Sequence, residues 1–176
     1  MASHIALRRV PEVLESAAVR ALPPATRYIL RGDAAVRARA EATLGLAVPA
    51  SPCRAAVSGE QAALWLGPDE WLLIVSDSAA QGLSGALGAL PHSLVDVSHR
   101  QAALLVHGPQ AEALLSAGCP LDVGAGAFPI GMCTRTMLAK AEVILWRTEA
   151  QAFRLEVWRS FLAYVGQFLA EAARGV

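Results

Sequence analysis

Residues 94–115 read LVDVSHRQAALLVHGPQAEALL, and this span contains an extended segment, an apolar strand, a turn and a helix in direct succession. The strand is expected at 102–106, the turn at His107-Gly108-Pro109 and the helix at 110–117. Pro109 suits the first helical turn, because its fixed φ matches a helix and its missing N–H would have no partner there. The span therefore predicts a strand-turn-helix unit.

The same order of elements occurs earlier in the chain. An apolar strand at 28–30 ends at Arg31-Gly32-Asp33, where the glycine supports a turn and Asp33 can accept hydrogen bonds from the first free amides of a helix. That helix is expected at 34–44, because Gly45 follows it as a stop signal. The chain thus contains two strand-turn-helix units.

Each unit is followed by a hairpin and a second helix. In the first half, apolar segments at 62–66 and 71–75 flank a Gly-Pro-Asp turn, and a helix is expected at 79–90. The second half carries a strand at 132–138, a hairpin of 143–146 with 152–157 around a turn at 147–151, and a closing helix from about 160 to 173.

Equivalent positions in the two halves are separated by a nearly constant interval. Gly32 and Gly108 are 76 residues apart and Trp71 and Phe153 are 82 apart, close to half of the 176 residues. The repeated pattern predicts an α+β fold of two similar strand-helix-hairpin-helix halves, with mainly antiparallel sheets covered by helices. The expected organisation is an N-terminal tail at 1–24 and a single unit at 25–176, made of pseudo-repeats at about 25–91 and 92–176.

The composition restricts the classes of partner. Fifteen basic residues balance fifteen acidic ones, so the chain has no net field for nucleic acid or an anionic membrane surface. No segment reaches the ~18–20 apolar residues of a membrane span. A neutral chain that is 55% hydrophobic tends to associate with other proteins. Its three cysteines are odd in number and lack metal or redox spacing, which is typical of reduced thiols in the cytoplasm.

Two resemblances relate this pattern to known protein families. The 94–115 span resembles the start of the folate-binding domain of the glycine cleavage T-protein, an aminomethyltransferase. From about Ala18 to the C-terminus the chain resembles the gamma subunits of heterotetrameric sarcosine oxidases. The motifs that carry this second resemblance are Leu66-Gly67-Pro68-Asp69-Glu70-Trp71-Leu72-Leu73, Cys119-Pro120-Leu121-Asp122, Phe128-Pro129 and Arg159-Ser160-Phe161.

The resemblance implies a role inside a larger complex. Such a complex oxidatively demethylates sarcosine to glycine and forms hydrogen peroxide and 5,10-methylenetetrahydrofolate. FAD, FMN, NAD, zinc and tetrahydrofolate are then expected in the alpha, beta and delta subunits, and none in this chain. The gamma subunit would be a structural copy of the folate-binding domain, located in the cytoplasm.

The residue motifs of this chain are consistent with a subunit that has no catalytic site of its own. The T-protein family places its key aspartate in a loop of the form N-E-x-G-G-x-x-D-D, whereas residues 138–146 read LAKAEVILW, with Glu142 as the only carboxylate. His92, His99 and His107 have no metal-ligand spacing. Adjacent residues of an extended segment alternate faces, so Asp96, Ser98 and His99 cannot align as a triad. A turn or strand-edge role is expected for Asp96 and Ser98. We therefore predict no catalytic, cofactor-binding or metal-binding residue.

Apolar residues that the chain cannot bury alone are the candidates for partner contacts. Tryptophans lie on or at the ends of the hairpins, and the loop at 119–130 is apolar but rich in proline and glycine. The candidate interface residues are Trp65, Trp146, Phe128 and Ile130. Folding of the loop onto its own core is the alternative for Phe128.

Two other functions stay open at this point. A free-standing folate-binding aminomethyltransferase-like protein would require a pterin-sized cavity with one buried carboxylate. A stand-alone protein-binding module would require a docking groove, which the sequence does not identify.

Overall fold

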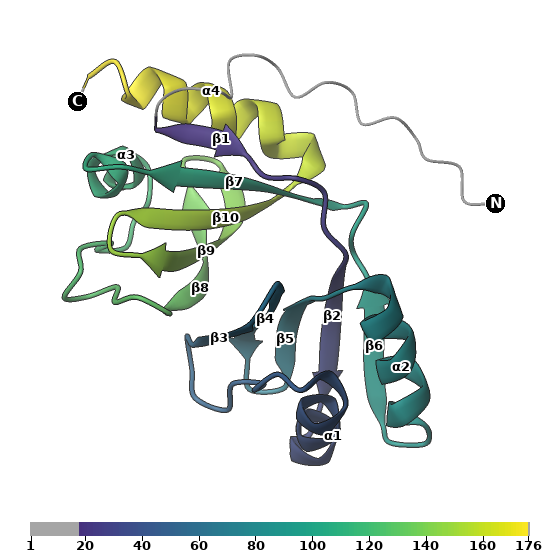
Figure 1. Cartoon of the computed structure of the whole chain (residues 1–176). Coiled ribbons are helices and arrows are strands. Elements are labelled where there is room, and N and C mark those ends of the chain that lie inside the picture. Colours follow the sequence, from purple (N-terminus) through teal and green to yellow (C-terminus); the bar gives the residue numbers. More distant parts are fainter. Residues whose placement is uncertain (1–17, 176) are drawn as a thin grey trace.

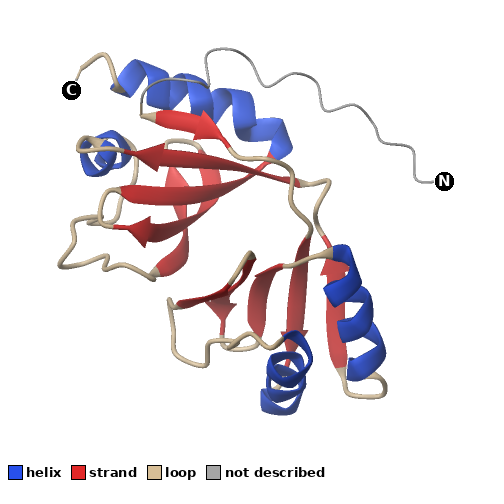
Figure 2. Ribbon diagram, in the orientation of Figure 1, coloured by secondary structure: helices blue, strands red, loops and turns tan. Residues whose placement is uncertain are grey.

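The computed structural model of the protein describes residues 18–175. The chain forms two five-stranded sheets that face one another, and each sheet carries two helices on its outer side (Figures 1 and 2). All strand pairs in both sheets are antiparallel. The predicted α+β class with helix-covered antiparallel sheets is confirmed.

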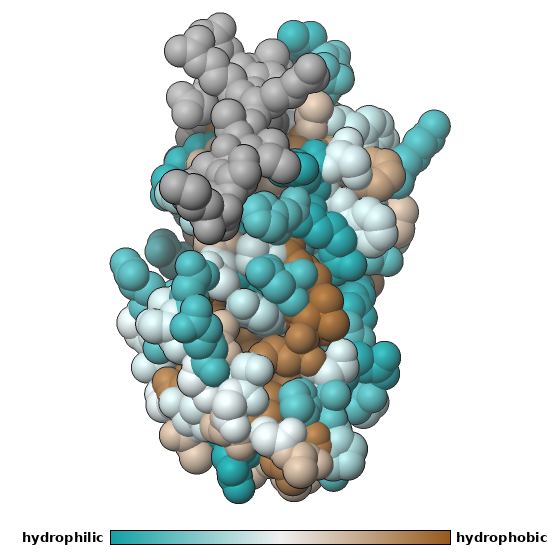
Figure 3. Space-filling model, turned by 90° about the vertical axis from the view of Figure 1, so that its right-hand side faces the viewer, coloured by the Kyte–Doolittle hydropathy of each residue, from teal (hydrophilic) through white to brown (hydrophobic). Residues whose placement is uncertain are grey.

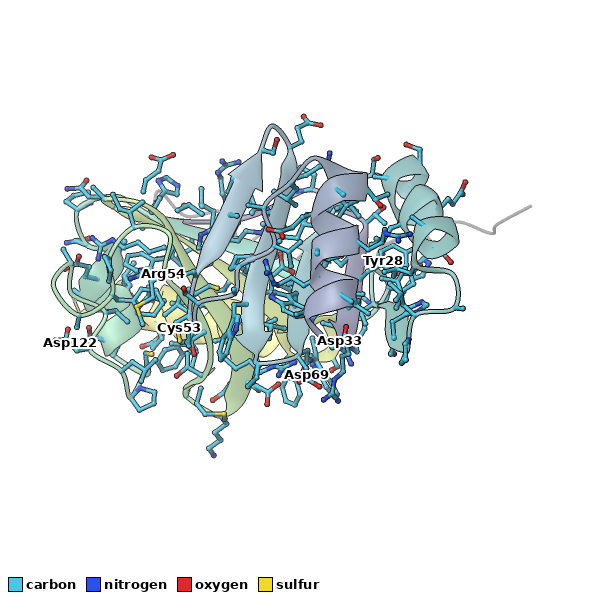
Figure 4. All side chains as sticks on the ribbon, turned by 90° about the horizontal axis from the view of Figure 1, so that it is seen from below. Tyr28, Asp33, Cys53, Arg54, Asp69 and Asp122 are labelled. Carbon is cyan, nitrogen blue, oxygen red and sulfur yellow. The ribbon has the colours of Figure 1, made fainter. Side chains whose placement is uncertain are left out.

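The first sheet is built from the first half of the chain. Its strands, in spatial order, are β3 (Ala55–Ser58), β4 (Gln61–Gly67), β5 (Glu70–Ile74), β2 (Arg27–Gly32) and β6 (His92–Asp96). Helices α1 (Ala34–Leu44) and α2 (Asp77–Leu87) cover it. The Asp33 carboxylate caps α1 by accepting hydrogen bonds from the amides of Ala35 at 2.9 Å and Val36 at 3.1 Å. Figure 4 shows Asp33 at this end of the helix, close to Asp69 of the hairpin turn.

The second sheet has the corresponding plan. Its strands are β1 (Val19–Ala21), β7 (Gln101–His107), β10 (Ala152–Trp158), β9 (Ala141–Glu149) and β8 (Cys133–Leu138). Helices α3 (Ala111–Ser116) and α4 (Leu162–Ala172) cover its outer face, and the short 3-10 helix η2 (Arg159–Phe161) leads into α4.

Gly32 ends β2 before α1, and Gly108 follows β7 before α3, so these glycines occupy equivalent turns. Trp71 lies on β5 and Phe153 on β10, which are equivalent strands. The predicted equivalent positions of these two residue pairs are therefore confirmed.

Three apolar clusters form the interior. One lies between the first sheet and helices α1 and α2, and includes Leu30, Trp71 and Leu83. A second lies between the other sheet and helices α3 and α4, and includes Phe153 and Leu169. The third, here called the inter-sheet core, fills the space between the sheets with Ala62, Leu64, Leu72, Ile74, Val97, Cys133, Ile144 and Trp146.

The two halves exchange their first strands. β1 precedes β2 in the chain but pairs with β7 of the second sheet, with Val19 opposite Val106. β6 precedes β7 but pairs with β2 of the first sheet, with Val95 opposite Ile29. Each half therefore supplies an edge strand to the sheet of the other half, and the halves are interlocked.

This exchange corrects the N-terminal boundary. The expected tail at 1–24 contains β1, and its Val19 is buried at 3% exposure. Residues 1–17 of that tail lie outside the described residues. A strand of three residues is too short to produce a readable alternation, so pairing with β7 determines it.

Two further elements differ from the sequence prediction. β3 was not predicted, because its residues are small or polar and are stabilised by pairing with β4. The turn expected at 147–151 is confined to Ala150 and Gln151, and β9 extends to Glu149.

The sheets are joined at the edges formed by β3 and β8. Arg54 and Met132 make an antiparallel bridge, and the amide of Cys133 donates to the carbonyl of Cys53 at 3.1 Å. Cys53 has φ of 57°, an uncommon left-handed conformation for a residue with a side chain. Figure 4 shows Cys53 and Arg54 beside the second sheet. This joint closes one side of the space between the sheets.

Candidate functional site

The polar centre between the sheets consists of Arg27, Arg154 and Glu156. Nε of Arg27 on β2 donates to Oε2 of Glu156 on β10 at 2.6 Å, and both side chains are 1% exposed. Nε of Arg154 donates to Oε1 of the same carboxylate at 2.8 Å. Two guanidinium groups thus share one buried carboxylate, and both oxygens of Glu156 already accept hydrogen bonds from them.

The segment at 96–98 holds Arg27 in place. The amide of Arg27 donates to Oγ of Ser98 at 2.9 Å, and the amide of Ser98 donates to Oδ1 of Asp96 at 2.8 Å. Nη1 of Arg27 also donates to the carbonyl of Ala25 at 2.7 Å. The predicted turn or strand-edge role of Asp96 and Ser98 is confirmed, because Asp96 ends the edge strand β6 and Ser98 lies in the turn that follows, next to the start of β2.

A cavity of about 150 Å³ adjoins the polar centre on the side where the sheets stay apart. Its walls include Ile29 of the first sheet and Glu142, Glu156 and Trp158 of the second. The guanidinium of Arg100 lies 5.1 Å from the ring centre of Trp158, a cation–π arrangement. Glu142 is the one carboxylate in the segment 138–146, which stands where the T-protein family has its aspartate loop. It lines this cavity, but its side chain is exposed.

A larger, open hollow of about 680 Å³ lies along the connection from β1 to β2. It is lined by residues 22–26, by the β3–β4 turn, by Ser76 and by Arg154. Its one lining carboxylate, Glu60, is exposed. Neither space combines ligand size with a free buried carboxylate.

The candidate interface residues separate into buried and exposed groups. Phe128 is 1% exposed and Trp146 is 8% exposed, so both are core residues, in correction of their expected place at an interface. Trp65 is half-buried, and Ile130 is 60% exposed. Ile130 and Trp65 remain proposed contact residues, because their side chains can reach a partner.

Arg147 explains why the loop around Phe128 folds inward. From β9 its Nη1 donates to the carbonyls of Val123 at 3.1 Å and Phe128 at 3.2 Å, and its guanidinium lies 4.9 Å from the ring centre of Phe153. The rings of Phe128 and Phe153 are 6.3 Å apart. The sequence did not predict this role, since Arg147 was expected in a turn, whereas the side chain is 3% exposed.

The structure reveals another set of exposed apolar side chains that the candidate interface omitted. Five of them are Val95, Met137, Trp158, Phe161 and Tyr164, with exposures from 37% to 50%. Val95, Met137 and Trp158 lie on strands, whereas Phe161 and Tyr164 lie in η2 and α4. Apolar residues of these kinds look like core residues in the sequence, and only the tertiary structure leaves them uncovered.

No group of three metal-ligating side chains occurs in residues 18–175, and no helix in this range is long and apolar enough to cross a membrane. Cys53, Cys119 and Cys133 are free thiols. Burial raises the pKa of the Cys133 thiol to about 12, and its Sγ donates a weak hydrogen bond to the carbonyl of Trp65 at 3.6 Å.

Comparison with known sequences gives a consistent family. A model described as the sarcosine oxidase, gamma subunit family matches residues 31–174. Sarcosine oxidase subunit gamma of Corynebacterium sp. (strain U-96) is 36% identical over 158 residues, which are 88% of this chain and 72% of that protein. The gamma subunit of Arthrobacter sp. is 38% identical over 117 residues, 64% of this chain and 57% of that protein.

Solved structures agree with the sequences. A chain of heterotetrameric sarcosine oxidase from Corynebacterium sp. U-96, in complex with pyrrole 2-carboxylate, matches with a TM-score of 0.85 and 31% identity over 89% of this chain and 83% of that chain. Glycine cleavage system aminomethyltransferase T from Bartonella henselae matches with a TM-score of 0.63 and 14% identity, over 92% of this chain and 48% of that chain. The second likeness concerns the fold alone. The chain belongs to the sarcosine oxidase gamma subunit family.

Proposed function

We propose that this chain is the structural gamma subunit of a heterotetrameric sarcosine oxidase, which converts sarcosine to glycine with formation of hydrogen peroxide and 5,10-methylenetetrahydrofolate. The observation that carries the proposal is the 36% identity to the Corynebacterium gamma subunit over 88% of the chain. The alpha, beta and delta subunits are the proposed partners, and they hold FAD, FMN, NAD, zinc and tetrahydrofolate. The assembly would reside in the cytoplasm.

The residues between the sheets do not fit tetrahydrofolate, the ligand that a folate-binding-domain fold implies. The cavity of about 150 Å³ is smaller than the ~300–1,000 Å³ typical of sites that bury a ligand of this kind. The buried carboxylate of Glu156 is already neutralised by Arg27 and Arg154. The larger hollow offers only the exposed Glu60.

These features argue against the alternative of a free-standing aminomethyltransferase-like protein. Such a protein needs a carboxylate that is free to meet the folate, and the polar centre uses its carboxylate internally. The contribution of this chain is therefore to hold its partners in their assembled arrangement.

Two measurements test the proposed function. Co-expression with the proposed alpha, beta and delta subunits should give one complex with sarcosine oxidase activity that contains this chain. The isolated chain should be colourless and should give no calorimetric signal with tetrahydrofolate. Stoichiometric flavin absorbance, or a micromolar folate isotherm, in the isolated chain would contradict the structural role.

A further inference from the structure

The outer edge of β6 is an open hydrogen-bonding edge. The amide of Val97 donates to the carbonyl of Arg27 at 2.9 Å, in continuation of the register that pairs Val95 with Ile29. Alternate residues of an antiparallel strand direct their backbone groups to opposite sides. The N–H and C=O groups of Leu94 and Asp96 therefore point away from β2, and within residues 18–175 no strand pairs with that side.

The other sheet edges differ from that of β6. β1 has three residues and β3 has four. β8 has six residues, and its start is occupied, because Met132 bridges to Arg54 and the amide of Cys133 donates to the carbonyl of Cys53. β6 has five residues, HSLVD, without proline, lysine or a bulge, and its one carboxylate, Asp96, already accepts a hydrogen bond from the amide of Ser98. An exposed edge of this kind can receive a further strand from another chain.

The side chains along this edge continue into the space between the sheets. Val95 and Ile29 are paired residues, so their side chains lie on the same face, and Ile29 lines the cavity of about 150 Å³ together with Trp158. Val95 is 50% exposed and Trp158 is 44% exposed. Figure 3 faces the side of the molecule on which β6 and α2 lie, and shows hydrophobic surface between the two halves and down the lower one.

Arg100 adds a charge preference to this surface. Its guanidinium lies over Trp158, its side chain is exposed, and it forms no ion pair with another residue of the described chain. A carboxylate that binds here would be paired with a cation whose position the indole ring already restricts.

We propose that an extended segment of a partner subunit adds to the first sheet along β6 as a sixth strand. Backbone hydrogen bonds to Leu94 and Asp96 supply its pairing. An apolar side chain of the segment packs beside Val95 and Trp158, and an acidic side chain meets Arg100. The proposal rests on the proposed function, because it requires the hetero-oligomer, and it assigns the position and chemistry of one contact in it.

The first test compares Val95→Lys with Val57→Lys in full chains co-expressed with the other subunits. Both valines are exposed on edge strands, at 50% and 59%, so the second substitution is a matched control. We expect Val95→Lys to reduce the co-purified partner subunits at least about tenfold and Val57→Lys to change them less than twofold, with circular dichroism spectra and melting curves of both isolated chains unchanged. Normal assembly of Val95→Lys would overturn the β6 contact and leave the proposed function intact, whereas a wild-type chain that recruits no subunit would overturn both.

Hydrogen exchange on wild-type protein provides a test that does not depend on a substitution. The amides of Leu94 and Asp96 should exchange at least about tenfold more slowly in the complex than in the isolated chain. Equal exchange in both would overturn the proposal. Slow exchange already present in the isolated chain would also overturn it. If deletion of residues 1–17 abolishes that slow exchange, the edge is assigned to the chain's own N-terminus. If the slow exchange depends on chain concentration, the edge is assigned to a second copy of the chain.

Discussion

Arg27 and Glu156 are 129 positions apart in the sequence, and their side chains form an ion pair of 2.6 Å in which each is 1% exposed. The pair connects β2 of the first sheet to β10 of the second. A buried ion pair gives little net stability compared with apolar residues of the same shape, but the loss of one partner leaves a charge without compensation. This relationship fixes how the two sheets are placed and uses the one carboxylate buried among the described residues.

Replacement of Arg27 by Ala should destabilise the chain. We expect the free energy of unfolding to fall by about 1–3 kcal/mol, because Glu156 would lose its closest hydrogen-bond donor while Arg154 still compensates its charge. Denaturant titration of the purified chain measures this change. Arg31→Ala is the control, since Arg31 lies on the same strand and its pair with Asp69 is 54% exposed on both sides. Equal effects of the two substitutions would show that burial of the first pair is energetically unimportant.

Phe128→Ala should destabilise the isolated chain. The side chain is 1% exposed and packs in the cluster with Phe153, so its removal should cost about 3–5 kcal/mol and lower the midpoint of thermal unfolding. Ile130→Ala, two residues away and 60% exposed, should leave that midpoint unchanged. An unchanged midpoint for Phe128→Ala together with weaker assembly would restore the interface role that the sequence suggested.

Gly32→Ala should be destabilising although alanine is a better former of regular structure. A Cβ atom at this position would lie 2.6 Å from Cβ and both Cγ atoms of Val36, and a contact this short forces the strand and α1 apart, at a cost of about 1–3 kcal/mol. Gly82→Ala in α2 is the control, because its Cβ would meet nothing within 4 Å and should add about 0.5–1 kcal/mol of stability. Chemical denaturation of both variants should show opposite signs, and a stabilised Gly32→Ala chain would contradict the packing.

Cys133 should react with alkylating reagents far more slowly than Cys53 or Cys119. Cys133 is 0% exposed, and burial raises its thiol pKa from 9.0 to about 12, so the reactive thiolate is scarce at pH 8. Because the folded state holds this proton more tightly than the unfolded state, the thiol contributes stability below about pH 9 that is lost as the pH rises towards 12. Peptide mass spectrometry after timed iodoacetamide treatment of the native chain measures the rates. Three equal rates would show that the inter-sheet core is open to solvent.

The exchange of β1 and β6 predicts that the halves cannot fold separately. A fragment ending at residue 91 lacks β6 and the Glu156 partner of Arg27, and a fragment starting at residue 92 lacks β1. Each fragment alone should give no cooperative thermal transition by circular dichroism, and the co-expressed pair should regain one. A cooperative transition in either fragment alone would show that its core does not depend on the exchanged strand.

Local signals in the sequence determined the elements that depend on neighbouring residues. Asp33 and Gly45 set the limits of α1, because a cap forms within one turn of the chain. The Gly-Pro-Asp turn gave the hairpin of β4 and β5, and the repeated order of signals gave two similar halves. The family motifs, which are also local, gave the likeness to the gamma subunits.

Tertiary structure alone decided the features that depend on distant residues. Pairing across more than 80 positions placed Val19 beside Val106, and no local pattern distinguishes a strand that joins its own half from one that joins the other. Arg147 and Phe128 became core because the loop at 119–130 folds over β9 and β10, where Arg147 bonds to the carbonyls of Val123 and Phe128 and lies over the ring of Phe153. Val95 and Trp158 stayed exposed although both are apolar residues on strands, because burial depends on whether another layer covers a face, and the two sheets leave that part of the face open.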